Sequence, residues 1–213
     1  MPDYSKLDHW SLKAQKENYP ARSVYKLIEM NQKFKLVNVN RKQRKILDLG
    51  AAPGSWSLYI LREFNRAPET DKPMTLSLVS VDLSPLSRQF DQGLFDRPAF
   101  RFIEGDFTRL EIKKDILSHG PYDIIMSDAA PATSGNRTID TARSLDLAES
   151  VLEYAETSLA MGGNLVMKIF QGGDTGKLLL RIKELFETGK SYKPAACRAG
   201  SFETYFLGLK KKG

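Results

Sequence analysis

Apolar residues recur along the chain at two spacings, one typical of strands and one typical of helices. Short, largely apolar runs predict strands at residues 45–49, 76–81, 100–103, 122–127, 163–170 and 204–209. Helical spacing predicts helices at residues 21–34, 57–64, 109–117, 143–161 and 175–187, the last with Asp174 as its N-cap. Strands that alternate with helices indicate an α/β fold with a mostly parallel sheet, covered by helices on both faces. A ligand of such a sheet binds at the carboxyl ends of the strands.

The turn after the first predicted strand has the composition of a ligand-binding loop. It reads DLGAAPGSW from Asp48 to Trp56, and a predicted helix follows directly. Glycines allow the backbone to bend sharply and to approach a ligand, and a helix N-terminus offers free N–H groups. The spacing is not the G-x-G-x-x-G of dinucleotide-binding turns. Asp48 at the strand end and Pro53 in the bend therefore favour a ligand without phosphates, such as S-adenosylmethionine. The alternative is a tight turn that binds nothing.

Three further aspartates follow the ends of predicted strands, namely Asp82, Asp106 and Asp128. An acidic residue at the place of Asp82 can accept hydrogen bonds from the ribose hydroxyls of an adenosine. Asp106 with Phe107 suits an adenine, because a carboxylate accepts from the exocyclic amine while the ring packs against the base. One such aspartate is more often a helix cap or a solvated loop residue. Three of them around one Gly-rich turn favour a ligand site.

Lys168 interrupts an otherwise apolar predicted strand. Burial of a lysine is costly unless it is paired, and desolvation or a second cation lowers the pKa of a lysine towards that of a usable base. Alternatively, the stem of Lys168 packs while its ammonium reaches solvent. Asp128 is a second candidate for catalysis, since it opens a polar segment, residues 133–137, that we expect to be a flexible substrate loop.

Positive charge is concentrated near the N-terminus. Up to Lys45 the chain holds eleven Lys and Arg against four Asp and Glu, whereas the net charge of all 213 residues is +6. We therefore expect a basic N-terminal arm at residues 1–20, followed by a single domain at residues 21–213. Aromatic residues lie among these charges, which favours RNA as the partner because unstacked bases dock on such rings. The alternative is a solvated, partly disordered tail.

Composition excludes several other classes of protein. A single cysteine, Cys197, excludes an intramolecular disulfide framework and a cysteine-based zinc site, and it fits a reducing compartment. His9 and His119 are isolated, so we expect no metal site. The chain has no apolar run of about 20 residues and no signal-peptide pattern. We expect a cytoplasmic monomer that does not bind membranes.

Six segments in order carry a more specific pattern. They are YPARSVYKL at 19–27, DLGAAPGSW at 48–56, GDF at 105–107, SDAAP at 127–131, KIFQG at 168–172 and RAGSFETY at 198–205. With these segments the chain resembles the FtsJ/RrmJ-type RNA ribose 2′-O-methyltransferases from about Tyr4 to its end. The resemblance implies a Rossmann-like fold with a mostly parallel, seven-stranded sheet. Two residues depart from the usual family pattern: Ser55 stands where Gly is frequent, and Cys197 where Ser is common.

The resemblance also assigns residues to roles. It implies a catalytic tetrad of Lys26, Asp128, Lys168 and Glu203. It implies contacts with S-adenosylmethionine from Gly54, Trp56, Asp82, Asp106 and Asp128, to which the turn and the strand ends add Asp48, Gly50 and Phe107. Lys168 is then the expected general base. A neighbouring Lys26 would favour its neutral form, whereas Asp128 and Glu203 would favour its charged form and leave Asp128 to take the proton.

The implied reaction is transfer of a methyl group from S-adenosylmethionine to a ribose 2′-hydroxyl of RNA. The first choice of substrate is a uridine of 23S-type large-subunit ribosomal RNA, and the second is a ribose in a tRNA anticodon loop. Two other classes stay open from the residues alone. One is an NAD(P)-dependent oxidoreductase, disfavoured by the turn, and the other is a non-catalytic RNA-binding relative, disfavoured by the intact tetrad.

Overall fold

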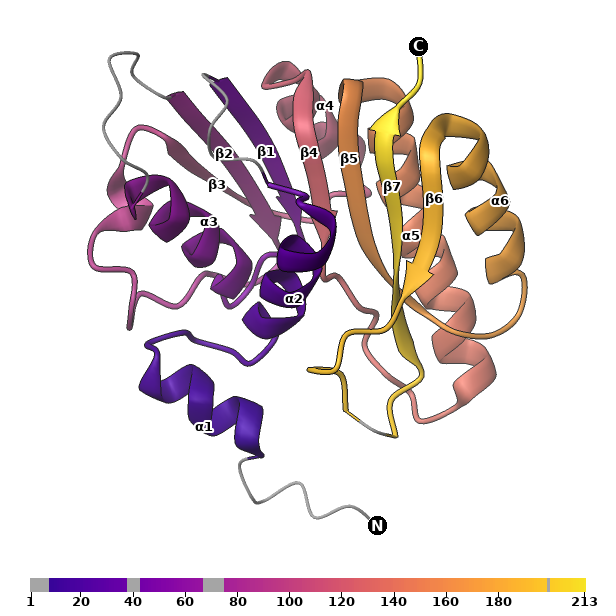
Figure 1. Ribbon diagram of the computed structural model, residues 1–213, viewed down its shortest axis with the longest axis horizontal. Helices are drawn as coiled ribbons and strands as arrows, with labels where there is room; N and C mark the ends of the chain where they lie inside the picture. The colour runs from indigo at the N-terminus through magenta and orange to yellow at the C-terminus, as the bar shows by residue number, and fades with distance from the viewer. Residues whose placement is uncertain (1–7, 38–42, 67–74, 199) are drawn as a thin grey trace.

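The computed structural model describes residues 8–37, 43–66, 75–198 and 200–213. Its centre is a seven-stranded sheet in the order β3-β2-β1-β4-β5-β7-β6 (Figure 1). The strands are β1 (Gln43–Leu49), β2 (Thr75–Asp82), β3 (Phe100–Glu104), β4 (Tyr122–Ser127), β5 (Leu159–Phe170), β6 (Phe186–Tyr192) and β7 (Glu203–Lys211). Only β7 runs antiparallel to its neighbours. The prediction of a mostly parallel α/β sheet is therefore confirmed.

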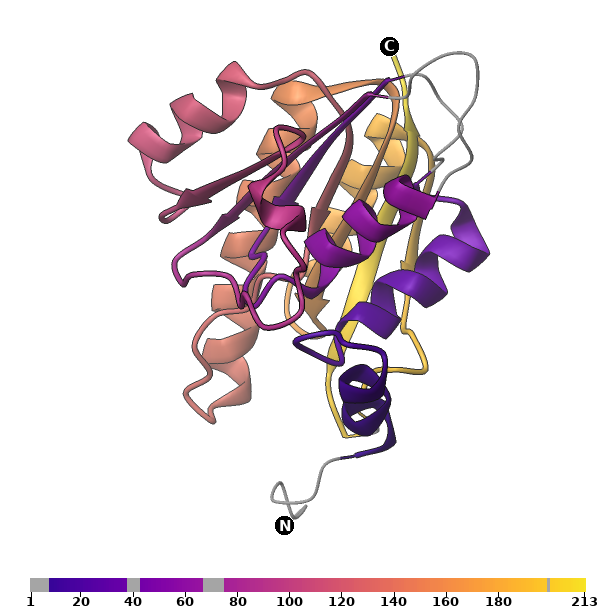
Figure 2. The ribbon, with the colours of Figure 1, turned by 90° about the vertical axis from the view of Figure 1, so that its left-hand side faces the viewer.

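Helices cover both faces of this sheet. One face carries α2 (Val24–Phe34) and α3 (Ser55–Arg66), and the other carries α4 (Leu110–Ser118), α5 (Arg137–Ser158) and α6 (Thr175–Leu185). Helix α1 (His9–Lys16) lies beyond the carboxyl ends of the strands and packs against α2, as Figure 2 shows from the side. A short 3₁₀ helix, η1 (Leu94–Asp96), precedes β3. Successive strand residues enter opposite cores: Ile46 packs with the first group of helices and Leu47 with the second. Burial of both faces explains why the central strands, such as β4, are apolar runs without polar alternation.

The winding of the sheet reverses between β1 and β4. From β1 the chain continues outward to β2 and β3, whereas from β4 it continues to β5 on the other side. In open α/β sheets the crevice at such a reversal, beyond the carboxyl ends of the strands, is where ligands bind. The β1–α3 turn and the segment after β4 both lie there.

Several element boundaries differ from the sequence prediction. Strand β6 was not predicted, because α6 ends at Leu185 and the chain enters the edge of the sheet where a helix was expected to continue to residue 187. Helix α5 begins at Arg137, since the side chain of Asn136 accepts hydrogen bonds from the N–H groups of Thr138 and Ile139. It ends at Ser158, and β5 begins directly afterwards. Asp174 does occupy the N-cap position of α6, but its side chain makes no capping hydrogen bond.

The described part of the basic arm is folded. Asp8 caps α1 by accepting a hydrogen bond from the N–H of Ser11 at 2.9 Å, and Ala14 is buried in the core. The Lys13 ammonium lies 4.6 Å from the centre of the Tyr25 ring on α2. Residues 9–16 are therefore a packed helix, capped by Asp8, and not a solvated tail. The predicted arm before residue 8 lies outside the described residues.

Candidate active site

Two ion pairs lie at the carboxyl edge of the sheet. Lys26 Nζ is 2.7 Å from Glu203 Oε1, and Lys168 Nζ is 3.1 Å from Asp128 Oδ1. Lys26 comes from the first turn of α2, Asp128 follows β4, Lys168 is near the end of β5, and Glu203 begins β7. All four side chains are largely buried. The structure thus brings the four predicted catalytic residues into two pairs from four separate elements.

The register of two antiparallel strands brings the pairs together. Residue Lys168 of β5 lies opposite Tyr205 of β7, and Phe170 lies opposite Glu203. The Tyr205 hydroxyl donates a hydrogen bond to Asp128 Oδ1 at 2.5 Å, and Lys26 Nζ lies 5.9 Å from the centre of the Tyr205 ring. Tyr205 therefore stands between the two ion pairs. Sequence reasoning missed this residue as part of the site, although its hydroxyl in an apolar strand is the same signal that drew attention to Lys168.

Charge and burial act against one another in this cluster. Burial would raise the pKa of Asp128, but Lys168, Lys26 and the Tyr205 hydrogen bond together hold it below the ordinary value. Burial would lower the pKa of Lys26, but Asp128 and Glu203 together raise it. Burial and the Asp128 carboxylate raise the pKa of Tyr205 far above its usual range. At neutral pH Asp128 is therefore ionised, Lys26 is charged and Tyr205 is a hydrogen-bond donor.

The β1–α3 turn lies against the segment that carries Asp128. Gly50 has φ +75°, and a Cβ at this position would be 2.6 Å from Cα of Ala129, so only glycine fits. Gly54 also has a left-handed φ of +103°. The N–H of Ala52 donates to Asp82 Oδ2 at 2.9 Å, which fastens this turn to the end of β2. The predicted cofactor residues Gly50, Gly54 and Asp82 therefore shape one continuous loop region.

Asp48 carries an unsatisfied oxygen at the base of this turn. Its side chain is buried, and Oδ2 accepts a hydrogen bond from the Ser57 hydroxyl at 2.6 Å. Oδ1 has no hydrogen-bond partner in the described protein. Burial raises the pKa of Asp48 to about 7, a shift that the Ser57 hydrogen bond opposes. A buried oxygen without a partner is rare in proteins, and it suits the cationic amine or sulfonium of a bound S-adenosylmethionine.

Asp106 lies after β3, on the same edge. Its Oδ1 accepts hydrogen bonds from the N–H and the hydroxyl of Thr108 at 2.9 and 2.7 Å, and these bonds lower the pKa of Asp106. The carboxylate is partly exposed, and Oδ2 is 3.7 Å from Nε of Arg109. Asp106 is therefore an ionised acceptor held by its own turn, as recognition of an exocyclic amine requires.

Two predicted cofactor residues have buried side chains. Trp56 is 2% exposed, and its indole N–H donates to the carbonyl of Ser23 at 2.9 Å, which ties α3 to the start of α2. Phe107 is 7% exposed and packs edge-on against Tyr154 of α5. The structure gives both side chains a packing role beneath the site. Their contact with a cofactor stays a prediction.

The described residues contain neither a cluster of metal ligands nor a membrane-spanning helix. No group of three His, Cys, Asp or Glu side chains there could hold a metal ion. In the same part of the chain, no helix combines the length and the apolar character needed to cross a membrane. The site is thus built from lysines, carboxylates, one tyrosine and glycine turns.

The sequence profile of FtsJ-like methyltransferases matches residues 19–211. The chain belongs to the FtsJ-like methyltransferase family. This membership confirms the predicted enzyme class and makes the oxidoreductase alternative wrong. The fold prediction for the family, a seven-stranded and mostly parallel sheet, is likewise confirmed.

Individual relatives and solved structures agree with this membership. Ribosomal RNA large subunit methyltransferase E of Treponema denticola is 49% identical over 99% of this chain and 98% of that protein. The protein of the same name from Borrelia duttonii is 40% identical over 96% of both chains. Among solved structures, a ribosomal RNA methyltransferase of Plasmodium falciparum aligns with a TM-score of 0.70 and 27% identity, covering 92% of this chain and 100% of that one. Human methyltransferase-like protein 13 shares the fold, with a TM-score of 0.56 and 14% identity over 87% of this chain and 81% of that one.

Proposed function

We propose that this FtsJ-like methyltransferase transfers a methyl group from S-adenosylmethionine to the 2′-hydroxyl of a uridine in large-subunit ribosomal RNA. The observation that carries the proposal is the pairing of Lys26 with Glu203 and of Lys168 with Asp128 beside the β1–α3 turn. The names of the relatives from Treponema denticola and Borrelia duttonii support the choice of ribosomal RNA. We further propose that the enzyme acts as a monomer in the cytoplasm.

The residues around the turn fit the proposed cofactor. S-adenosylmethionine supplies, when bound, a methyl group on a positively charged sulfur. Asp48 offers a partnerless buried oxygen for a cationic group, and Asp82, at the end of β2, offers a carboxylate for ribose hydroxyls. Asp106 offers an acceptor for the adenine amine. The free N–H groups at the start of α3 remain available for further polar contacts.

Lys168 is placed to take the proton of the ribose hydroxyl. Its nitrogen donates to two oxygens of Asp128, the carboxylate Oδ1 and the backbone carbonyl. A lysine nitrogen has three positions for hydrogens or a lone pair, so one position remains for the 2′-hydroxyl. In neutral Lys168 that position is the lone pair, which would accept the hydroxyl proton as the methyl group passes from sulfur to the ribose oxygen and leaves a neutral thioether behind. Lys26 and the hydrogen bond from Tyr205 help Lys168 to keep Asp128 ionised, and Glu203 pairs with Lys26.

Labelled methyl transfer tests the function. Purified enzyme with labelled S-adenosylmethionine is given undermethylated large ribosomal subunits, protein-free large-subunit RNA or tRNA, and the modified nucleotide is mapped. We expect a 2′-O-methylated uridine in the large-subunit samples. Label confined to an anticodon-loop ribose of tRNA would favour the second substrate. Label on a base would contradict ribose methylation, and no label with any RNA would favour a non-catalytic relative.

A further inference from the structure

A cleft separate from the ion pairs lies on the side of the molecule. It has a volume of about 390 Å³ and is lined by residues from the second half of α3, the segment around η1 and the link between α1 and α2. Three arginines line it: Arg62 and Arg66 of α3, and Arg97 just after η1. We name it the arginine cleft. Arg62 follows the first residue of α3 by seven positions, which places it roughly 10 Å along the helix from the β1–α3 turn.

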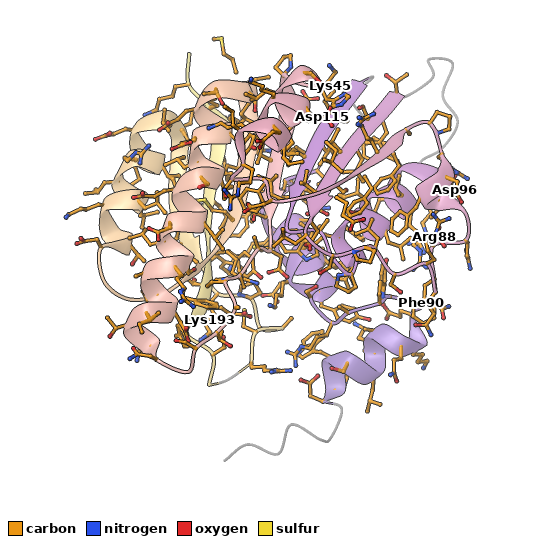
Figure 3. All side chains as sticks on the ribbon, turned by 180° about the vertical axis from the view of Figure 1, so that it is seen from behind. Lys45, Arg88, Phe90, Asp96, Asp115 and Lys193 are labelled. Atoms are coloured by element: carbon orange, nitrogen blue, oxygen red, sulfur yellow. The ribbon has the colours of Figure 1, made fainter. Side chains whose placement is uncertain are left out.

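Arg62 is held rigidly in the wall of this cleft by neutral groups. Its guanidinium donates to the backbone carbonyls of Glu17 at 3.2 Å, Asn18 at 3.0 Å and Phe90 at 3.1 Å. It also lies 4.6 Å from the centre of the Tyr19 ring. Figure 3 shows Phe90 close to α1, from which the Glu17 and Asn18 link departs. Because these partners carry no negative charge, they orient the guanidinium without neutralising it.

The other two arginines are exposed and can turn towards a ligand. Arg97 donates to the side-chain oxygen of Asn65 at 2.7 Å, which is a neutral partner. Arg66 forms an exposed pair with Glu63 at 3.3 Å, a type of contact that contributes little to stability. Arg66 can therefore leave Glu63 and bind a better acceptor, such as a phosphate oxygen.

The carboxylates around the cleft are already engaged. Arg88 lies 3.1 Å from Asp91 and 2.5 Å from Asp96. Figure 3 labels Arg88 and Asp96 next to each other. Glu17, the acid that lines the cleft, accepts a hydrogen bond from the Tyr25 hydroxyl at 2.9 Å and lies 3.9 Å from the Lys13 ammonium. Three arginines therefore face one partly neutralised acid, which leaves an excess of positive charge.

We propose that the arginine cleft binds a backbone phosphate of the RNA substrate, away from the ribose that is methylated. This inference rests on the proposed function. Guanidinium groups match phosphate oxygens through paired N–H donors, and Asn65 and Gln92 supply amides for the remaining oxygens. The cleft borders the end of α1, whose last turn carries Lys13 and Lys16. Positive charge that continues from the cleft onto α1 suits a passing polyanionic strand better than a single enclosed anion.

Such a contact positions the RNA without reading its sequence. The cleft would fix one point of the backbone while the target ribose reaches Lys168, so that the distance between the two points selects RNA of the right shape. Loss of the contact therefore acts on RNA binding and leaves the chemical step unchanged.

The test compares two double variants that each remove two positive charges. Arg66→Gln with Arg97→Gln alters the cleft, and Lys177→Gln with Arg181→Gln alters exposed ion pairs on α6, across the sheet. Affinity for protein-free large-subunit RNA is measured over a series of salt concentrations, together with methyl transfer. For the cleft variant we expect the slope of log affinity against log salt to fall by about one and the KM for RNA to rise several-fold. Its kcat and its affinity for S-adenosylmethionine should match those of the wild type, and the α6 variant should match the wild type throughout.

Any result other than the expected one contradicts the cleft proposal, the proposed function or both. If the wild type methylates RNA and the two variants behave alike, the cleft proposal is overturned while the function stands. If the wild type neither binds nor methylates RNA, the function and the cleft proposal fail together. Calorimetry with inorganic phosphate at constant ionic strength tests whether the cleft binds free phosphate instead of a phosphate of RNA. Phosphate binding that the cleft variant loses, with an unchanged RNA salt slope, would make the cleft a free-anion site and overturn the proposal.

Discussion

Lys168 binds two oxygens of one residue, Asp128. Its Nζ lies 3.1 Å from the carboxylate Oδ1 and 2.5 Å from the backbone carbonyl oxygen. The lysine head is thereby fixed to the segment that follows β4, although Lys168 itself belongs to β5. One bonding position of the nitrogen remains, and its direction is set by the other two. This geometry explains how a flexible side chain can be held for a single proton transfer.

Substitution of Lys168 distinguishes the two candidate proton acceptors. Lys168→Ala should lower methyl transfer by about 10²–10⁴-fold, since it removes the group that binds the hydroxyl. Lys168→Arg keeps donors for Asp128 but cannot be deprotonated, so it should be similarly inactive if Lys168 is the base. Single-turnover methyl transfer measures both, and calorimetry with S-adenosylhomocysteine should give unchanged affinity. An arginine variant with more than about a tenth of wild-type turnover would assign the proton to Asp128.

Asp106 should matter for the cofactor and not for the reaction. In Asp106→Asn the amide oxygen can still accept the two hydrogen bonds from Thr108, so the turn is preserved. The amide nitrogen replaces the outer oxygen and presents a donor to the adenine amine. We expect cofactor binding to weaken by about 1–3 kcal/mol, the cost of an unpaired buried donor. Calorimetry with S-adenosylmethionine measures it, and an unchanged affinity would remove Asp106 from the site.

The sequence predicted the centre of the sheet well and its edge poorly. The strands β1 and β4 are buried on both faces, so their apolar runs were plain. Strand β6 is an edge strand of sequence FETGKSY, in which only Phe186 is fully buried. Helix α6 leads directly into it without a Gly or Pro stop signal, so the helical pattern of the sequence predicts a helix that continues to residue 187. What decides this boundary is pairing with β7, a contact between distant residues.

The sequence predicts the positions of the site residues, but it does not predict which of them pair with one another. The aspartates at strand ends and Lys168 in β5 are local signals, and their positions in the structure agree with them. Pairing of Lys26 with Glu203 depends on how α2 lies over β7, which no local pattern contains. The side chain of Trp56 packs beneath the site and donates to the carbonyl of Ser23, a contact that no local pattern predicts, and its contact with a cofactor stays a prediction.

Asp48 should make stability depend on pH. An unfolded aspartate ionises near pH 4, whereas burial raises the pKa of Asp48 to about 7 in the folded protein. Between these values the folded state holds the extra proton, so its stability falls as pH rises from about 4 to about 7, by at most about 4 kcal/mol. Asp48→Asn lacks this term and should gain stability relative to the wild type on going from pH 5 to pH 8. Urea unfolding at both pH values measures the difference, and a constant difference would show that Asp48 is ionised in both states.

Gly50 should be irreplaceable because of its neighbour and not only because of its backbone angle. Gly50 and Gly93 both have φ +75°, but a Cβ at Gly50 would lie 2.6 Å from Cα of Ala129, whereas a Cβ at Gly93 would meet nothing within 4 Å. Gly93→Ala should therefore cost only the left-handed strain, about 1–2 kcal/mol. Gly50→Ala adds overpacking of about 1–3 kcal/mol and displaces the segment that carries Asp128. We expect Gly50→Ala to lower the unfolding midpoint further and to lose methyl transfer at temperatures where it is still folded. Equal midpoints and equal activities for the two variants would show that the close approach to Ala129 is not needed.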